Sequence, residues 1–321
     1  MSFPRHSRWI RLVSFAGLSV LCLTALVAGT LMGWAKRSPI MTQAILNGAA
    51  ATVGIKQADP FEGQDHLTLL VLGCDADLSR GGKKVLKKYA RSDMMMVARL
   101  DFTQSRISGL SIPRDTLVAA GKYGEQKINA YHQFGGKDLA KEAVENLLPG
   151  VKVDRVVILD FEAFQDVVNT VGGVEIFVPK RMKWTDKAAK LYIDLKPGKQ
   201  VLDGYNAMCF VRYRHGDSDF LRTDRQRDFL MAFKAAVFSD PLHLPEVANK
   251  GAAVLNNSLS ISEILSLGKF TQKIGNDNIK MGLLPTVEAE GYNLRVDQSK
   301  LDATLQEFHL TDGTTRVSLI P

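Results

Sequence analysis

Several charged segments of this chain combine cations and carboxylates in a way that suits a phosphorylated ligand. Residues 111–115 have the sequence Ser-Ile-Pro-Arg-Asp and follow a stretch that is typical of a strand. Pro113 lacks an amide proton and cannot continue a central ladder, so the chain leaves the sheet there. Arg114 and Asp115 therefore follow a strand end, where α/β folds place ligands. A structural ion pair is the alternative for this Arg-Asp step taken alone.

Two aspartates flank a loop that is rich in cations. Asp75 comes just after the apolar run 66–73, and Asp93 comes just before the run that begins at residue 94. If the two strands are antiparallel neighbours, both carboxylates reach one edge of the sheet. Two carboxylates together with phosphate oxygens are a usual shell for Mg²⁺. Helix capping is the alternative for either aspartate alone.

Further cations follow in the second half of the chain. Arg212 and Arg214 are two residues apart, so on a strand both guanidinium groups would face one side. Arg222, Arg225 and Gln226 open an amphipathic helix, whose N-terminus itself favours an anion. Guanidinium groups bind phosphate oxygens through two hydrogen bonds and stay charged at any working pH. Pairing with nearby aspartates is the alternative, and it explains one or two of these arginines more easily than all.

Strands and helices alternate along the part of the chain that must position these residues. Continuous apolar runs indicate buried strands, and Pro-Gly or Gly-Gly steps end two of the helices. The expected strands cover residues 66–73, 94–102, 106–113, 156–159, 174–178 and 279–285. The expected helices cover residues 137–148, 161–171, 222–238, 244–256 and 260–274. This order predicts an α/β fold with a mixed central β-sheet flanked by helices.

The N-terminal residues predict a membrane anchor. Residues 12–34 form a 23-residue stretch without a charge, which is long enough for a helix to cross a bilayer. A cleaved signal peptide is the alternative, but its apolar region would be shorter and would end in a small-x-small site. Three cations precede the stretch and two follow it, a weak bias toward a cytoplasmic N-terminus. We therefore expect a cytoplasmic segment 1–11, a transmembrane helix 12–34, a stalk 35–64 and an extracytoplasmic domain 65–321.

Composition and charge exclude some functional classes. The chain has 321 residues with 45% apolar composition, enough for one large domain or two small ones. Five of its seven net positive charges lie in residues 1–37, so the remainder is nearly balanced and does not indicate a nucleic-acid partner. The sequence has no P-loop motif and no His-Glu-x-x-His motif. Cys74 and Cys209 are expected as buried apolar residues rather than as a disulfide.

Taken together, the motifs resemble the LytR-CpsA-Psr family of membrane-anchored cell-envelope phosphotransferases. Each piece alone is weak, but the ordered set across residues 66–240 is specific. The matching segments are Gly73-x-Asp75, Arg91-Ser92-Asp93, residues 111–115, Lys127-Ile128-Asn129, Gly172-Gly173-Val174, Leu202-Asp203-Gly204, Arg212-Tyr213-Arg214, Asp219-Phe220-x-Arg222 and Arg225-Gln226.

The resemblance implies a fold, a reaction and a set of site residues. The fold is an α/β sandwich that holds a polyprenyl-pyrophosphate lipid, with the lipid chain in an apolar cavity and the headgroup at its mouth. The implied reaction moves a glycopolymer from this carrier to an envelope acceptor such as peptidoglycan, outside the lipid bilayer. Asp75, Asp93 and Arg114 would be catalytic, and the two aspartates would hold Mg²⁺ or Mn²⁺. The implied pyrophosphate-binding residues are Arg114, Lys127, Arg212, Arg214, Arg222, Arg225 and Gln226.

Some alternatives stay open at the level of the sequence. The family often has an arginine soon after the first aspartate, whereas here four residues separate Asp75 from Arg80. Asp77 is therefore an alternative to Asp75 as a metal ligand. The expected reaction is attack of an acceptor hydroxyl on the sugar-proximal phosphorus, with polyprenyl phosphate leaving. A regulator that binds the same lipid without chemistry and a pyrophosphatase that uses water as acceptor are the alternative functions.

Overall fold

The structure, a computed structural model, describes residues 59–74, 91–186, 191–213, 219–240, 244–254 and 258–311. All of them belong to one compact unit, Asp59–Pro321. The expected transmembrane stretch 12–34 lies outside the described residues. Among the helices that are described, none has both the length and the apolar character needed to cross a bilayer.

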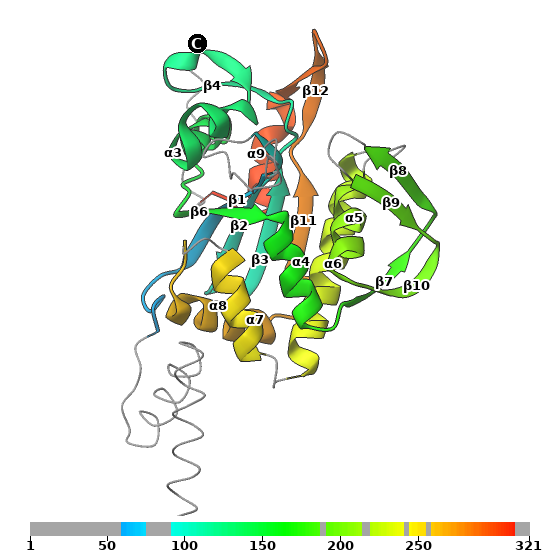
Figure 1. The fold of residues 1–321 in the computed structure, drawn as a ribbon. Helices are drawn as coiled ribbons and strands as arrows, with labels where there is room; N and C mark the ends of the chain where they lie inside the picture. The colour runs from blue at the N-terminus through cyan, green and yellow to red at the C-terminus, as the bar shows by residue number, and fades with distance from the viewer. Residues whose placement is uncertain are drawn as a thin grey trace, which may run out of the picture. The chain divides into compact units, whose positions relative to one another are not determined.

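A five-stranded mixed sheet lies at the centre of the unit (Figure 1). Its order is β11-β3-β2-β1-β6, and only β2 runs opposite to the others. Four strands therefore end at the same edge of the sheet, and β2 begins there; we call this the carboxyl edge. The strands are β1 His66–Cys74, β2 Ser92–Asp101, β3 Arg106–Ser111, β6 Arg155–Asp160 and β11 Ile279–Leu283.

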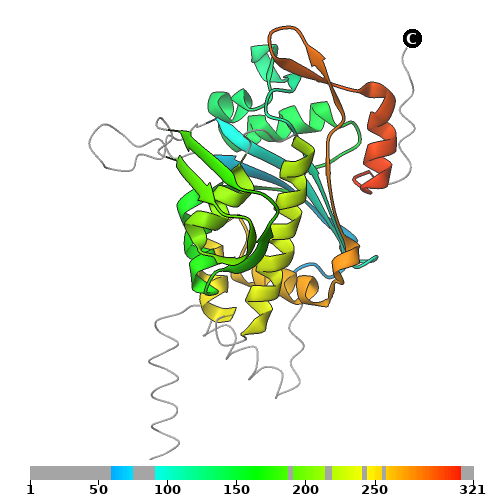
Figure 2. The same cartoon turned by 90° about the vertical axis from the view of Figure 1, so that its right-hand side faces the viewer.

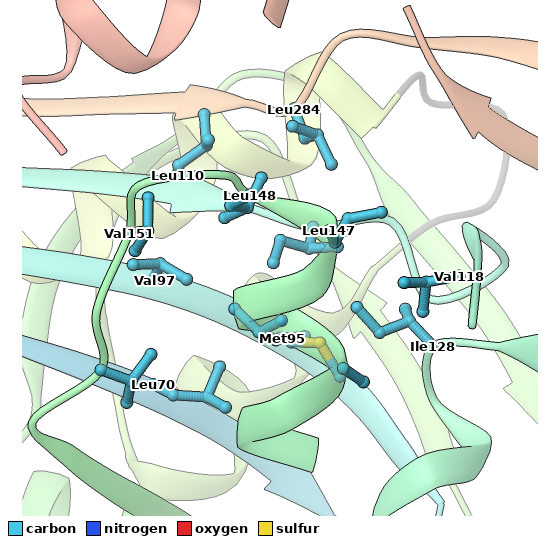
Figure 3. Close-up of a cluster of buried hydrophobic side chains, with 14 of the residues drawn as sticks. Leu70, Met95, Val97, Leu110, Val118, Ile128, Leu147, Leu148, Val151 and Leu284 are labelled. Atoms are coloured by element: carbon cyan, nitrogen blue, oxygen red, sulfur yellow. The ribbon is translucent and has the colours of Figure 1, made fainter. Parts of the chain in front are cut away.

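One face of the sheet is covered by the helices α3 Ala130–Leu147 and α9 Gln298–Glu307. Alternate strand residues point toward this layer, and Leu70, Leu72 and Leu110 are fully buried in it. Figure 3 shows this cluster, which also contains Leu147 from the end of α3. Burying one such leucine contributes roughly 1.5–3 kcal/mol, so this layer is a main source of stability.

The opposite face of the sheet is covered by the remaining long helices (Figures 1 and 2). These helices are α4 Phe161–Thr170, α6 Asp219–Ser239, α7 Leu244–Val254 and α8 Ile261–Lys273. The strand residues Leu69, Ala98, Gly109 and Met281 form one row across this face. Except for Gly109 they remain partly exposed, although helices lie over them. We call this the half-buried face, because its packing is less complete than that of the α3 side.

A second hydrophobic cluster forms beside the main sheet. It contains α5 Gly204–Arg212 and packs α4 and α6 against two strand pairs. The pairs are β7 Val174–Val178 with β10 Gly198–Leu202, and β8 Met182–Asp186 with β9 Leu191–Leu195. The Gly172-Gly173 break predicted between α4 and β7 is present, and both glycines have positive φ angles. A Cβ atom at Gly173 would lie 2.8 Å from the carbonyl oxygen of Leu202, so only glycine fits this turn.

Two further short strand pairs are present, one against α3 and the other against the first pair, and the sequence reasoning did not anticipate either. They are β4 Leu117–Ala119 with β5 Glu125–Lys127, and β12 Thr286–Ala289 with β13 Asn293–Val296. The short 3-10 helices are η1 Gly121–Tyr123 and η3 Asn276–Asn278. The bridge between Thr116 and Leu294 joins the two pairs. The helix expected at 137–148 starts earlier, because α3 includes a first turn before a break at Gly135 and Gly136.

Candidate active site at the carboxyl edge

The pairing of β1 with β2 brings Asp93 to the carboxyl edge, where β1 ends one residue before Asp75 in the chain. The strands are antiparallel neighbours, as the expectation of a shared edge requires. Cys74 pairs with Ser92 and Gly73 pairs with Met94, so Asp93 is the additional residue of a β-bulge. Bulges commonly re-aim a side chain next to an active site. Asp75 follows Cys74 directly in the chain.

The side chains of these acids are not part of what the structure describes. Asp75 and its alternative Asp77 lie outside the described residues, and of Asp93 only the backbone is described. Their role as metal ligands therefore stays a prediction. Asp160, the last residue of β6, pairs with Cys74 and brings a further acidic residue to the same edge. The sequence reasoning missed it, because its place at the edge depends on the pairing of β6 with β1.

Arg114 and Asp115 lie just beyond the end of β3, as predicted from Pro113. Thr116 Oγ1 donates a hydrogen bond of 2.7 Å to the carbonyl oxygen of Pro113 and fixes the turn. Asp115 lies between two cations, with Oδ1 2.8 Å from Lys127 Nζ and Oδ2 3.6 Å from Arg114 Nε. The alternative of a structural ion pair is thus partly correct. The side chains of Arg114 and Lys127 nevertheless remain 40% and 35% exposed, so both cations are accessible to an anion.

A cleft of about 620 Å³ opens beside Arg114. Its walls come from the segment before β2, the turn after β3, the pair β4–β5, the start of α3 and β13. Asn129 in its wall is only 6% exposed, and its Oδ1 atom has no hydrogen-bond partner among the described residues. Such an orphaned buried acceptor is uncommon and marks a place for a polar ligand or water. The lining residues are Arg91, Arg114, Asp115, Leu117, Glu125, Gln126, Lys127, Asn129, Ala130, Phe134 and Asn293.

Arg212 approaches the carboxyl edge from a helix. The prediction that Arg212 and Arg214 share the face of a strand is wrong for Arg212, which is the last residue of α5. Its guanidinium carbon lies 4.2 Å from the ring centroid of Phe161, and this cation–π contact holds the charge beside the end of β6. Arg214 lies outside the described residues.

Arg225 has contacts that the sequence reasoning did not anticipate. Its side chain is buried, and Nε donates a hydrogen bond of 3.2 Å to the carbonyl oxygen of Phe210. A second nitrogen donates to the carbonyl oxygen of Tyr213, just past the end of α5. Arg225 thus satisfies main-chain acceptors at a helix C-terminus. Its predicted contact with pyrophosphate is untested, and these hydrogen bonds give it a structural role.

Two further predicted contact residues lie on α6. Arg222 falls in the first turn of this helix, which begins at Asp219, but its side chain is not described. Gln226 is 5% exposed, and its Oε1 atom has no hydrogen-bond partner among the described residues. Gln226 is therefore able to accept a hydrogen bond from a ligand or water.

Comparison with known proteins places this geometry in one family. A model of the LytR_cpsA_psr family matches residues 36–309. The polyisoprenyl-teichoic acid–peptidoglycan teichoic acid transferase TagT of Bacillus subtilis (strain 168) is 30% identical over 306 residues, which cover 94% of this chain and 93% of that protein.

Solved structures give the same result for the fold. The crystal structure of B. subtilis TagV has a TM-score of 0.61 and 29% identity, and the match covers 78% of this chain and 99% of that one. The LytR-CPS2A-psr family protein YwtF (TagT), solved with bound octaprenyl pyrophosphate lipid, has a TM-score of 0.56 and 28% identity. That match covers 79% of this chain and 92% of the other.

Proposed function

This chain belongs to the LytR-CpsA-Psr family, and on that premise we propose that it transfers a glycopolymer from a polyprenyl-pyrophosphate carrier to an envelope acceptor such as peptidoglycan. The observation that carries the proposal is the carboxyl edge. Arg114 and Lys127 lie there as accessible cations, and the bulge at Asp93 sits on the same edge. A relative named as a teichoic acid transferase and a neighbour solved with a prenyl pyrophosphate support the substrate class.

The lipid chain belongs on the half-buried face of the sheet. Leu69, Ala98 and Met281 are apolar and partly exposed beneath helices, which is the environment that a long prenyl chain can fill. Each buried methylene of the lipid gains about 0.8 kcal/mol of transfer free energy. The pyrophosphate then lies at the carboxyl edge, next to Arg114 and Arg212.

Among the described residues, the cations make the main contribution to the proposed reaction, because they can stabilise negative charge. Phosphoryl transfer spreads negative charge over the phosphate oxygens, and fixed positive groups stabilise that charge in the transition state. Arg114 and Arg212 supply guanidinium groups that can bind phosphate oxygens through two hydrogen bonds, and Lys127 adds a third cation from β5. Asp115 orients Arg114 and Lys127 through its two ion pairs.

A divalent cation is part of the proposal. Asp93, together with Asp75 or Asp77, would hold Mg²⁺ or Mn²⁺, because carboxylate oxygens are the donors that these hard cations prefer. The bound ion would neutralise charge on the phosphate oxygens. The described residues contain no cluster of three or more His, Cys, Asp or Glu side chains that could hold a metal by themselves. The proposed metal site therefore depends on Asp93 and on Asp75 or Asp77.

The experiment incubates the full chain with a polyprenyl-pyrophosphate-linked glycan, Mg²⁺ and soluble peptidoglycan oligomers, and it identifies products by mass spectrometry. A phosphodiester between glycan and oligomer supports transfer. Release of a free glycan phosphate alone would indicate a pyrophosphatase, and lipid binding without turnover would indicate a regulator. Arg114→Ala should reduce turnover about tenfold or more, since a charge-assisted hydrogen bond contributes roughly 1.5–3 kcal/mol. Arg181→Ala, which removes an exposed pair with Asp194, is the matched control.

We also propose that residues 12–34 anchor the chain as a single transmembrane helix, with the domain outside the cytoplasmic membrane. The uncharged 23-residue stretch supports this topology. A C-terminal alkaline phosphatase fusion should be active. An inactive fusion, together with an active cytoplasmic reporter at the same position, would contradict the topology.

A further inference from the structure

The carboxyl edge has two flanks of opposite character. On one side lies the half-buried face, where Leu69 and Met281 present apolar surface beneath helices. On the other side lies the 620 Å³ cleft, which includes the amides of Gln126, Asn129 and Asn293. The walls of the cleft include β4, β5, the start of α3 and β13. Arg114 lines the cleft and lies at the edge that the two flanks share.

The direction of phosphoryl transfer decides what each flank can hold. In a displacement at phosphorus, the attacking oxygen and the leaving oxygen lie roughly in line, on opposite sides of the phosphorus atom. If the prenyl phosphate leaves along the half-buried face, the attacking hydroxyl has to arrive from the cleft. We infer that the cleft seats the acceptor saccharide whose hydroxyl attacks the phosphorus, an inference that rests on the proposed function.

The side chains of the cleft match the chemistry of a saccharide. Sugar hydroxyls both donate and accept hydrogen bonds, and the amides of Gln126 and Asn293 can do the same. Asn129 Oδ1 is a buried acceptor with no partner among the described residues, so a sugar hydroxyl can donate to it. Phe134 offers an aromatic surface for the apolar CH face of a sugar ring. Most of the lining residues are polar or charged, as suits a ligand with many hydroxyl groups, and Leu117, Ala130 and Phe134 form the apolar part of the wall.

Phe134 is exposed but rigidly held. Its ring stacks on that of Tyr123, with centroids 4.7 Å apart and an interplanar angle of 19°. Tyr131 meets it edge-on at 6.2 Å. Gly136, with a φ angle of 69°, interrupts α3 directly after this turn, so residues 130–134 can depart from the direction of the helix. A ring fixed in this way loses little conformational freedom when a ligand binds.

The two carboxylates in the wall of the cleft are each paired with a cation. Asp115 lies 2.8 Å from Lys127 Nζ. Glu125 accepts two hydrogen bonds of 2.7 Å from Arg295, and these lower the pKa of the Glu125 carboxyl. The cleft therefore offers ion pairs and amides rather than an unopposed negative charge, and a polar saccharide can bind beside the pyrophosphate without repulsion.

The test measures steady-state kinetics of the full chain with separate control of the two substrates. The donor is a polyprenyl-pyrophosphate-linked disaccharide, and the acceptor is a soluble uncrosslinked peptidoglycan oligomer. Phe134→Ala should raise the KM for the acceptor about fivefold or more, because aromatic anchors dominate binding sites of this kind. The KM for the donor should stay unchanged, and the melting temperature should fall only slightly, because the variant loses the ring contacts with Tyr123 and Tyr131. Phe134→Tyr should restore the acceptor KM, and Phe177→Ala, on an exposed aromatic of β7, is the matched control.

The possible results separate this inference from the proposed function. A rise in the donor KM with an unchanged acceptor KM would assign the cleft to the donor glycan and overturn the inference. Unchanged constants for both substrates would show that the cleft holds no saccharide. If the wild-type chain gives no transfer, the proposed function fails. Direct binding of an N-acetylglucosamine tetramer then tests whether the cleft still binds a saccharide. If the wild-type chain binds the tetramer, and Phe134→Ala weakens this binding while Phe177→Ala does not, the saccharide site is supported. If the wild-type chain does not bind the tetramer, the inference is wrong.

Discussion

Replacement of Arg225 by alanine should destabilise the domain far more than replacement of Arg227, two positions along the same helix. Arg225 is 5% exposed and donates to the carbonyl oxygens of Phe210 and Tyr213, where α5 ends. The side chain of Arg227 is 44% exposed and forms ion pairs with Asp224 and Asp228 on its own helix. The two arginines thus differ in burial while sharing residue type and helix.

The magnitude follows from the contacts that are lost. A hydrogen bond from a charged group contributes roughly 1.5–3 kcal/mol, and truncation of Arg225 removes two and leaves their acceptors inside the protein. We expect a loss of about 3–5 kcal/mol in the free energy of unfolding, which corresponds to about 6–20 °C in melting temperature for a domain of this size. The exposed pairs of Arg227 contribute about 0–1 kcal/mol.

The assay is thermal unfolding of both variants, followed by circular dichroism, with lipid binding measured on the same samples. Arg225→Ala should melt well below the wild-type protein, and Arg227→Ala should melt close to it. A normal melting temperature for Arg225→Ala, combined with a large loss of lipid affinity, would refute the structural role. It would return Arg225 to the pyrophosphate site that the sequence predicted.

Three further outcomes are expected. Burial would raise the pKa of Asp101, but hydrogen bonds from the Gln104 main-chain amide, Thr103 and Arg106 lower this pKa below its usual 3.8. The stability that Asp101 contributes is therefore present above pH 3.8 and is lost as the pH falls through the lower pKa. Asp101→Asn should flatten this part of an acid titration of the melting temperature. Burial raises the pKa of the Cys209 thiol to about 11, so this thiol should react slowly at pH 8. Mass spectrometry after iodoacetamide treatment at pH 8 should find Cys209 unmodified and the partly exposed Cys74 modified first. Equal labelling of the two cysteines would contradict this. Asp93→Asn should abolish the Mg²⁺-dependent part of turnover, and normal metal-dependent rates in that variant would exclude Asp93 as a ligand.

Local rules predicted the parts of the site that depend on one segment. Pro113 fixed the end of β3 and hence the place of Arg114, because a proline cannot continue a central ladder. The apolar runs predicted β1 and β2 as strands, and the antiparallel pairing on which the shared edge depended is present. Cys74 and Cys209 are not joined in a disulfide, in line with the expectation that they serve as small apolar residues.

Features that depend on contacts between distant segments were not predictable in this way. The i and i+2 spacing of Arg212 and Arg214 suggested a strand. That interpretation did not take account of Asp203, the N-cap residue of the helix that contains Arg212. Asp203 accepts a hydrogen bond of 2.8 Å from the Asn206 amide and starts α5, and an Asp-Gly step was the available signal. The cleft combines Arg91 with Asn293, which are about two hundred residues apart in the chain, so no local pattern could indicate it. The helix predicted from residue 137 begins at Ala130 instead, because a further turn precedes the break at Gly135 and Gly136.

The register between β1 and β2 has a consequence for how enzymes of this design can diversify. Because Cys74 and Ser92 are paired, the backbone positions from which residues 75–91 depart and return are set by the ladder and not by the segment itself. Lengthening a loop adds little to its closure entropy, since each doubling costs only about 0.6 kcal/mol. Residues can therefore be inserted or exchanged between Asp77 and Arg91 while the start of β2, with Asp93, stays in place. The segment can then change in length and composition while β1 and β2 keep their register.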